Sequence, residues 1–186
     1  MRFIVRTCPP RAEYLAYLQE KIPNLEVVTD SVMDPTRRGF DAFLDSLKLA
    51  GDDGVVHLED DILLTDNFIE KICKVIEDQQ YVLIQFFSMR KKDLEVGSRF
   101  EPGRTFMMTQ CVYYPEGMSA EVLEFYGNLI ESGRGENLGY DEVVALFMRQ
   151  RGMEYYIHVP SLVDHRVCKS VINPKRSSKR QSLTFQ

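Results

Sequence analysis

The first half of the sequence alternates between segments with strand character and segments with helix character. Runs of apolar β-forming residues predict strands at 2–7, 25–29, 55–58 and 81–87. Apolar residues at helical spacing lie between these strands, most clearly Phe40, Phe43, Leu44 and Leu47. Strands that alternate with helices form βαβ units, in which the helices cover the sheet. We therefore expect an α/β fold, in one domain because no linker or repeat divides the 186 residues.

The order of elements is more mixed in the second half. Further strands are expected at 105–114 and 155–159, and further helices at 119–130 and from residue 141 to about residue 152. Residues 89–104 are rich in Arg, Lys, Glu and Gly and show no periodicity. A segment of this length and composition predicts a mobile loop.

Three helix starts carry signals in the sequence. The segment Asp34-Pro35-Thr36 is expected to open the helix that contains Phe40. Asn67 and Glu70 have the spacing of a capping pair, and Ser119 is expected to cap the helix that follows it.

Charge is distributed unevenly along the chain. The net charge is −5, although residues 164–186 contain six Lys or Arg and a single Asp. The protein therefore combines an acidic body with a basic C-terminal segment. Such a segment can contact the phosphates of a nucleotide, a nucleic acid or a membrane surface, or it can be a solvated tail.

Cysteine usage and hydropathy bear on the cellular location. The four cysteines are scattered and form no C-x-x-C pair, which favours reduced thiols over zinc ligands or disulfides. No apolar run approaches the roughly 20 residues of a membrane span, and the N-terminus does not resemble a secretory signal. These features indicate a cytoplasmic protein without a membrane span.

The strongest functional signal is the junction between a buried strand and an acidic run. The apolar strand Val55–Leu58 leads directly into Glu59, Asp60 and Asp61. Ligands of open α/β sheets bind beyond the carboxyl ends of the strands. Alternate residues of an extended segment point the same way, so Glu59 and Asp61 are expected to face one site while Asp60 turns aside or binds a neighbouring group. Carboxylate oxygens are suitable ligands for Mn²⁺ or Mg²⁺, which favours a metal site. The alternative is that the acidic run is a solvated turn without a function.

This Glu-Asp-Asp run after an apolar strand resembles the D-x-D motif of GT-A-fold glycosyltransferases. The resemblance implies a compact domain with a central mixed sheet flanked by helices. It also implies that Asp61 is a direct metal ligand and that Glu59 and Asp60 contact the metal or the nucleotide sugar. Glu59 departs from the family pattern, which has Asp at this position.

Two later segments are similar to the same family. The segment Val159–His165 resembles one in which a late histidine completes the metal site, which makes His165 a metal ligand. The segment Asn137–Glu142 matches the place where a carboxylate takes the proton of the acceptor. Adjacent helical residues point about 100° apart, so Asp141 is favoured over Glu142 as this base. The alternative for Asp141 is a helix-capping role.

The resemblance also assigns the contacts to the donor. Arg6 and Thr7, at the end of the first strand, are expected to bind the nucleotide, and Lys169, Arg176 and Arg180 are expected to clamp its diphosphate. A catalytic domain of residues 1–165 would then be followed by a basic segment, 166–186, that closes over the donor or stays partly mobile.

The resemblance thus implies a Mn²⁺- or Mg²⁺-dependent glycosyltransferase, inverting and with a UDP-sugar favoured as donor. The acceptor would be a hydroxyl group of a glycan or of a modified base in DNA. Clustered carboxylates also fit a metal-dependent phosphohydrolase or nucleotidyltransferase. A non-catalytic module that binds a nucleotide sugar or a nucleic acid is the third alternative.

Overall fold

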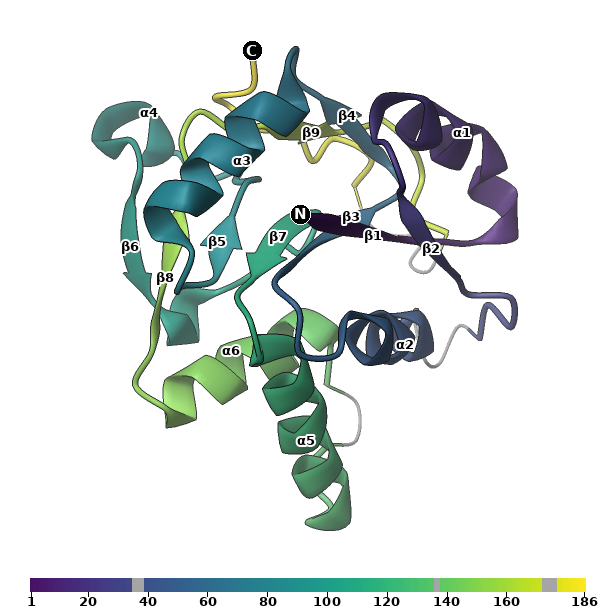
Figure 1. The fold of residues 1–186 in the computed structure, drawn as a ribbon, viewed down its shortest axis with the longest axis vertical. Helices are drawn as coiled ribbons and strands as arrows, with labels where there is room; N and C mark the ends of the chain where they lie inside the picture. The colour runs from purple at the N-terminus through teal and green to yellow at the C-terminus, as the bar shows by residue number, and fades with distance from the viewer. Residues whose placement is uncertain (35–38, 136–137, 172–176) are drawn as a thin grey trace.

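The computed structural model describes residues 1–34, 39–135, 138–171 and 177–186. Within these ranges, seven strands form one mixed sheet in the order β2-β1-β3-β7-β5-β8-β6 (Figure 1). Their bounds are β1 Arg2–Thr7, β2 Glu26–Thr29, β3 Val55–Glu59, β5 Ile84–Gln85, β6 Arg99–Pro102, β7 Cys111–Tyr114 and β8 Glu154–Ile157. The expected strands at 81–87 and 105–114 are therefore shorter than the sequence pattern indicates.

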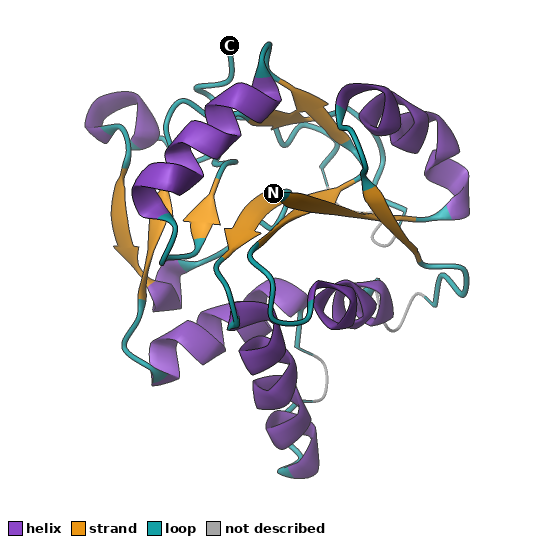
Figure 2. Ribbon diagram, in the orientation of Figure 1, coloured by secondary structure: helices purple, strands orange, loops and turns teal. Residues whose placement is uncertain are grey.

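Helices cover both faces of this sheet, as expected for an α/β fold (Figure 2). One face packs against α2, α5 and α6, and the other packs against α1 and α3. The bounds of these helices are α1 Ala12–Lys21, α2 Phe40–Ala50, α3 Phe68–Gln79, α5 Met118–Glu131 and α6 Tyr140–Gln150. Each helix buries an apolar stripe, such as Phe68, Ile72 and Ile76 of α3. The expected mixed sheet flanked by helices is confirmed.

A second sheet of two strands lies beyond the end of β3. It pairs β4, Ile62–Leu64, with β9, Val163–His165, in antiparallel register. Ile62 lies opposite His165, and the backbone N–H of Arg166 donates to the carbonyl of Asp61 at 2.8 Å. This register brings a residue more than a hundred positions away next to the acidic run.

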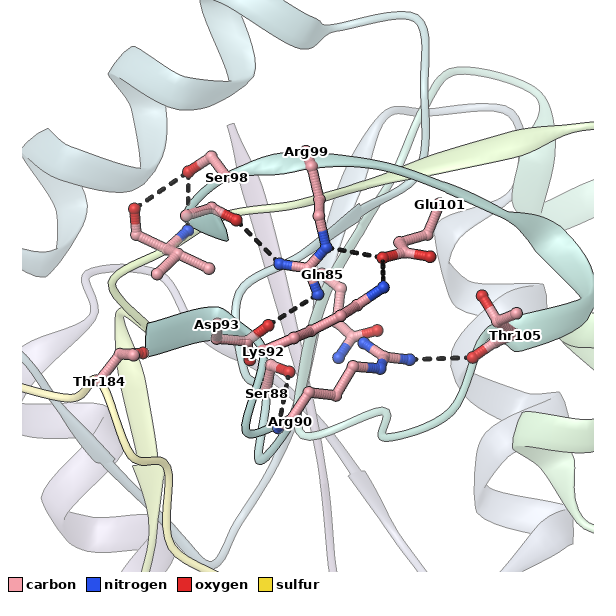
Figure 3. A network of polar contacts seen from close by, with 12 residues as sticks. Gln85, Ser88, Arg90, Lys92, Asp93, Ser98, Arg99, Glu101, Thr105 and Thr184 are labelled. Atoms are coloured by element: carbon pink, nitrogen blue, oxygen red, sulfur yellow. Dashed lines mark hydrogen bonds and ion pairs between the residues drawn. The ribbon is translucent and has the colours of Figure 1, made fainter. Parts of the chain in front are cut away.

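The prediction of a mobile loop at 89–104 is wrong. The segment contains the short helix α4, Asp93–Val96, then β6 and a 3₁₀ turn at Gly103–Thr105. Figure 3 shows Arg99 donating to both Asp93 and Glu101, at 2.7 and 2.6 Å. Lys92 also pairs with Glu101. The charges that suggested mobility are therefore paired with one another, and β6 gains a ladder with β8.

The three predicted helix starts differ from the structure. Asn67 precedes α3 with a left-handed φ of 54°, and its side chain makes no capping hydrogen bond. Gly117, not Ser119, flanks α5, because the backbone there has a φ of 80° that favours glycine. Helix α2 begins at Phe40 after Gly39, whose φ is 72°. Of the predicted opening segment, residues 35 and 36 lie outside the described residues.

Among the described helices, the longest and most apolar stretches fall short of what a membrane crossing needs.

Candidate active site

The candidate site lies at one edge of the main sheet. Strands β1, β3, β5 and β8 run in the same direction, so their carboxyl ends meet at this edge (Figure 1). Arg6 of β1 pairs in register with Glu59 of β3. The two strand ends therefore bring basic and acidic side chains together around a cavity. Its lining also includes Gly39, Ala42, Tyr140, Ser170, Val171 and Arg180.

Glu59 is held by four neighbouring side chains. Its Oε1 accepts hydrogen bonds from the hydroxyls of Thr109 and Tyr140 at 2.8 and 3.1 Å. Its Oε2 accepts a hydrogen bond from the amide of Gln110 at 3.3 Å. The guanidinium of Arg6 lies 3.5 Å from Oε1. Both carboxylate oxygens are thus occupied by protein donors, which fixes the orientation of this side chain.

Arg6 is buried and lies against two aromatic rings, which stack on each other with their centres 5.4 Å apart. The carbon of its guanidinium lies 4.7 Å from the centre of the Tyr140 ring and 5.4 Å from that of Phe43. Burial and the nearby Glu59 carboxylate raise the pKa of the Tyr140 hydroxyl, so this group stays protonated as a donor. These contacts give the cavity a rigid cationic wall.

Asp60 and Asp61 share one cation, Arg11. Asp60 accepts hydrogen bonds from Thr7 at 2.8 Å and from Nη1 of Arg11 at 2.7 Å. The same Nη1 lies 2.5 Å from Oδ2 of Asp61. Glu59 and Asp61 both line the cavity, and Asp60, which binds these two neighbouring groups, lines it as well. Strand β3 ends at Glu59 and the chain bends, so the period of two stops there.

Asp61 faces the ring of His165, and both side chains are buried. Oδ2 of Asp61 lies 3.0 Å from Nε2 of His165, but the two atoms do not form a hydrogen bond. The other oxygen, Oδ1, is buried and has no partner. Nδ1 of His165 lies 2.6 Å from the carbonyl oxygen of Arg166, which can only accept. The ring proton therefore sits on Nδ1, and the lone pair of a neutral His165 at Nε2 points towards a carboxylate.

Two electron-rich atoms at 3.0 Å repel each other unless positive charge lies with them. Burial alone would raise the pKa of Asp61. Without a metal ion, a proton on Nε2 of His165 and the charge of Arg11 would supply this positive charge, and they lower the pKa of Asp61 to about 2. A metal ion bound by both atoms would supply the same positive charge. The buried, partner-less Oδ1 offers a further ligand atom, so these residues fit a cation.

Two residues of the C-terminal segment also approach Asp61. Sγ of Cys168 and Nη2 of Arg180 each lie 3.9 Å from Oδ2. The described part of the segment is held by further contacts: Ser182 donates to Asp164 at 2.7 Å, and Ser161 donates to Thr184 at 3.1 Å. Lys169 is exposed and is not part of the cavity lining, whereas Arg176 lies outside the described residues.

Asp141 and Glu142 differ in their surroundings at the start of α6. Glu142 is exposed and accepts a hydrogen bond from the backbone of Gly139 at 2.6 Å, as a helix cap does. Asp141 is half-buried, next to Tyr140 of the cavity wall. Burial raises the pKa of Asp141, and the neighbouring Glu142 and Glu59 carboxylates add to this shift. A raised pKa makes Asp141 a better proton acceptor than an ordinary aspartate.

Six of the sequence-predicted residues thus line one cavity: Arg6, Thr7, Glu59, Asp60, Asp61 and Arg180. His165 is not a lining residue but contacts Asp61, and Asp141 and Glu142 are not part of the lining. Sequence reasoning missed Arg11, Tyr140 and Cys168. Arg11 had a usable signal, because it follows the Pro-Pro pair at the end of the first strand. Tyr140 and Cys168 stand within one to three residues of predicted site residues, but neither has a motif of its own.

Comparisons with known proteins bear on the fold. No family model matches the sequence, and no curated protein matches it significantly. Among solved structures, a protein described as a glucose-1-phosphate thymidylyltransferase of Bacillus anthracis superposes with a TM-score of 0.51. It is 13% identical, and the match covers 89% of each chain.

A second similar structure is residues 1–349 of TarS from S. aureus. It has a TM-score of 0.51 and 9% identity, and the match covers 88% of this chain and 59% of the TarS chain. At such low identity both likenesses concern the fold alone. The chain has a fold of the nucleotide-diphospho-sugar transferase type.

Proposed function

We propose that this protein is a divalent-metal-dependent glycosyltransferase that moves a sugar from a nucleotide-sugar donor to a hydroxyl group. The observation that carries this proposal is the contact between Asp61 and His165. A buried carboxylate and a buried imidazole lone pair face each other where the resemblance to GT-A enzymes puts the metal.

Asp61 and His165 would hold the ion, either Mn²⁺ or Mg²⁺, with Glu59 nearby at the end of the same strand. A metal ion bound here neutralises the charge that develops on the diphosphate leaving group. The carbonyl of Arg166 keeps the Nε2 lone pair of His165 available as a ligand. The metal site is therefore prepared by the protein before any ion arrives.

The arginine side chains of the cavity are suited to bind the nucleotide and the diphosphate of the donor. Arg6, Arg11 and Arg180 line the same cavity as Thr7 and the acidic run. Guanidinium groups form paired hydrogen bonds with phosphate oxygens. We assign Arg6, Thr7, Glu59 and Asp60 to the nucleotide, preferably of a UDP-sugar, and Arg180 to its diphosphate. Lys169 and Arg176 would strengthen this contact if the segment 166–186 closes over the donor.

We assign Asp141 as the base that takes the proton of the acceptor hydroxyl, with inversion at the sugar carbon. Its half-buried position and raised pKa support this role. Glu142 is the weaker candidate, because its carboxylate already accepts the Gly139 N–H. The acceptor would be a hydroxyl of a glycan or of a modified base in DNA.

The test is a panel of nucleotide sugars, each measured with Mn²⁺, with Mg²⁺ and with a chelator. Thermal stabilisation reports donor binding, and release of nucleoside diphosphate reports turnover or slow hydrolysis. The proposal predicts that one donor stabilises the protein only when metal is present and that it yields nucleoside diphosphate. Equal stabilisation by that donor with the chelator would contradict the metal dependence.

A nucleotidyltransferase is the second candidate, favoured by the mutual 89% coverage with the thymidylyltransferase structure. That reaction joins a nucleoside triphosphate to a sugar phosphate and releases pyrophosphate. Pyrophosphate formation from these two substrates, without turnover of any nucleotide sugar, would select it. Release of inorganic phosphate alone would indicate a phosphohydrolase, and donor binding without turnover a non-catalytic binding module.

The cysteines support a reducing compartment for this activity. All four are unpaired, including the buried Cys111. We therefore place the enzyme in the cytoplasm, where nucleotide sugars and reduced thiols coexist.

A further inference from the structure

Cys168 completes a group of three ligand atoms around one point. Oδ2 of Asp61, a ring nitrogen of His165 and Sγ of Cys168 all lie within 4.8 Å of one another. Asp61 and His165 are fully buried, and Cys168 is half-buried. The sequence pattern gave Cys168 no role beyond packing, since it has no cysteine partner nearby in the chain.

The local backbone holds His165 and Cys168 towards the same point. The carbonyl oxygen of Arg166 accepts the backbone N–H of Cys168 at 2.9 Å and lies 2.6 Å from Nδ1 of His165. One carbonyl therefore fixes both the tautomer of the imidazole and the turn that returns the thiol to Asp61.

The spacing of the three atoms fits direct coordination. Metal–ligand bonds of about 2.0–2.1 Å to nitrogen or oxygen and about 2.3 Å to sulfur place tetrahedral ligand atoms roughly 3.3–3.5 Å apart. The observed separations from Oδ2 of Asp61 are 3.0 Å to Nε2 of His165 and 3.9 Å to Sγ of Cys168. The third separation, between His165 and Cys168, is at most 4.8 Å, so a shift of up to about 1 Å at the half-buried Cys168 brings all three atoms onto one ion.

We propose that Cys168 is the third metal ligand and that this thiolate makes the site prefer thiophilic divalent ions, such as Zn²⁺ and Co²⁺, to Mg²⁺. The inference rests on the metal site of the proposed function and extends its choice of ion beyond Mn²⁺ and Mg²⁺. Soft thiolate ligands favour these transition metals, whereas Mg²⁺ prefers oxygen ligands and keeps its water. On binding, the Cys168 thiol loses its proton to the solvent and a sulfur–metal bond forms.

The Arg11 guanidinium next to Asp61 does not prevent a metal ion from binding there. Arg11 contacts Oδ2 of Asp61 but also donates to Asp60 at 2.7 Å, so Asp60 retains the guanidinium when a metal takes Asp61. The second oxygen of Asp61, Oδ1, has no partner to lose. An Asp–His–Cys set supplies three protein ligands and keeps a position open for a donor oxygen.

The test is titration of the metal-free full chain with Co²⁺, followed by visible and near-ultraviolet absorption. A thiolate-to-cobalt charge-transfer band reports sulfur coordination without any turnover. We expect the band in the unmodified protein, its loss in Cys168→Ser, and a fall of about tenfold or more in Zn²⁺ affinity in that variant. Cys8→Ser is the matched control, because Cys8 is a cysteine that lines the neighbouring cavity.

Each other outcome overturns the inference in a recognisable way. Co²⁺ binding without the band would remove Cys168 as a ligand but leave the metal site of the proposed function intact. Loss of the band in Cys8→Ser, with the band retained in Cys168→Ser, would assign the sulfur to Cys8 instead. Absence of any Co²⁺, Zn²⁺ or Mn²⁺ binding would overturn both this inference and the metal dependence of the proposed function. Displacement of Co²⁺ by equimolar Mg²⁺ would contradict the stated preference.

Discussion

Glu59 and Asp61 stand two residues apart at the end of one strand, yet their carboxylates are bonded in different ways. Both oxygens of Glu59 accept hydrogen bonds from neutral side chains. One oxygen of Asp61 accepts none, and the other lies 3.0 Å from a ring nitrogen that does not donate to it. A carboxylate with all its lone pairs in use is held in place, whereas one with a free buried oxygen can still bind a cation.

The same difference extends to the residues around each carboxylate. The Glu59 side consists of Arg6, Thr109, Gln110 and Tyr140, which form a closed network with it. The Asp61 side consists of Arg11, His165, Cys168 and Arg180, which approach it from distant segments without completing its hydrogen bonds. We therefore assign contacts with the nucleotide to the Glu59 side and metal binding to the Asp61 side.

The largest expected effect separates the two acids directly. Asp61→Asn should lower metal affinity by more than about 100-fold. Substitution of a residue that only hydrogen-bonds to a metal ligand already lowers metal affinity by about 10–100-fold, and Asp61 is proposed as a ligand itself. Glu59→Gln should leave metal affinity nearly unchanged, since its partners are protein donors. Isothermal titration with Mn²⁺ measures both, and thermal unfolding of each variant checks that it folds. Equal losses of metal affinity in the two variants would contradict the different roles of Asp61 and Glu59.

Loss of the base should reduce turnover without affecting binding. Asp141→Asn should lower turnover by about 10² to 10⁴-fold while donor and metal affinity stay the same. Turnover and binding are measured on the same preparation with the donor found in the panel.

Glu142→Gln is the matched control for this prediction. It should instead weaken the start of α6, with a loss in unfolding free energy of about 1 kcal/mol and little change in turnover. An Asp141→Asn enzyme with normal turnover would exclude Asp141 as the base and point to Glu142 or to a mechanism that retains configuration.

Removal of the cation that Asp60 and Asp61 share should strengthen metal binding. Arg11→Gln eliminates a positive charge 2.5 Å from the Asp61 carboxylate. Metal affinity should then rise about tenfold, because like charges in a partly buried site repel strongly. The metal-free variant should be less stable by about 3 kcal/mol, since Asp60 loses its partner, and added Mn²⁺ should restore part of the melting temperature. Arg11→Lys, which keeps the charge, should show no gain in affinity.

The smallest expected effect lies within the Glu59 side. Tyr140→Phe removes one hydrogen bond to Glu59 and should cost about 1 kcal/mol of unfolding free energy. Thr109→Val, which removes the other hydroxyl donor to the same oxygen, should cost a similar amount. Neither should alter Mn²⁺ affinity in calorimetry. A clear change in metal affinity would show that Glu59 also binds the ion.

The sequence predicted the fold class because its signals are local. The apolar strand Val55–Leu58 and the helix stripe of Phe40, Phe43 and Leu47 need no distant partner to be recognised. The loop at 89–104 failed for the opposite reason. Its charged residues looked solvated, but Arg99 meets Asp93 and Glu101 only once the chain has folded back on itself.

The sequence predicted the acidic residues of the site, but not which side chains each of them contacts. The strand end at Glu59 located the cavity, but the bend after it redirected Asp60 towards Arg11 and Thr7. His165 came from a resemblance, and its position beside Asp61 depends on the register of β4 with β9. The ties of Cys168 to Asp61 and of Tyr140 to Glu59 bridge 107 and 81 positions in the chain, which no local pattern encodes.

The most direct measurement is anomalous diffraction from a crystal soaked in Mn²⁺ together with a nucleoside diphosphate. The account predicts one strong manganese peak within bonding distance of Asp61 and His165, with Glu59 still bonded to Thr109 and Tyr140. A manganese peak on Glu59 that leaves Asp61 with Arg11 would contradict it, as would a bound nucleotide with no metal between its phosphates and Asp61.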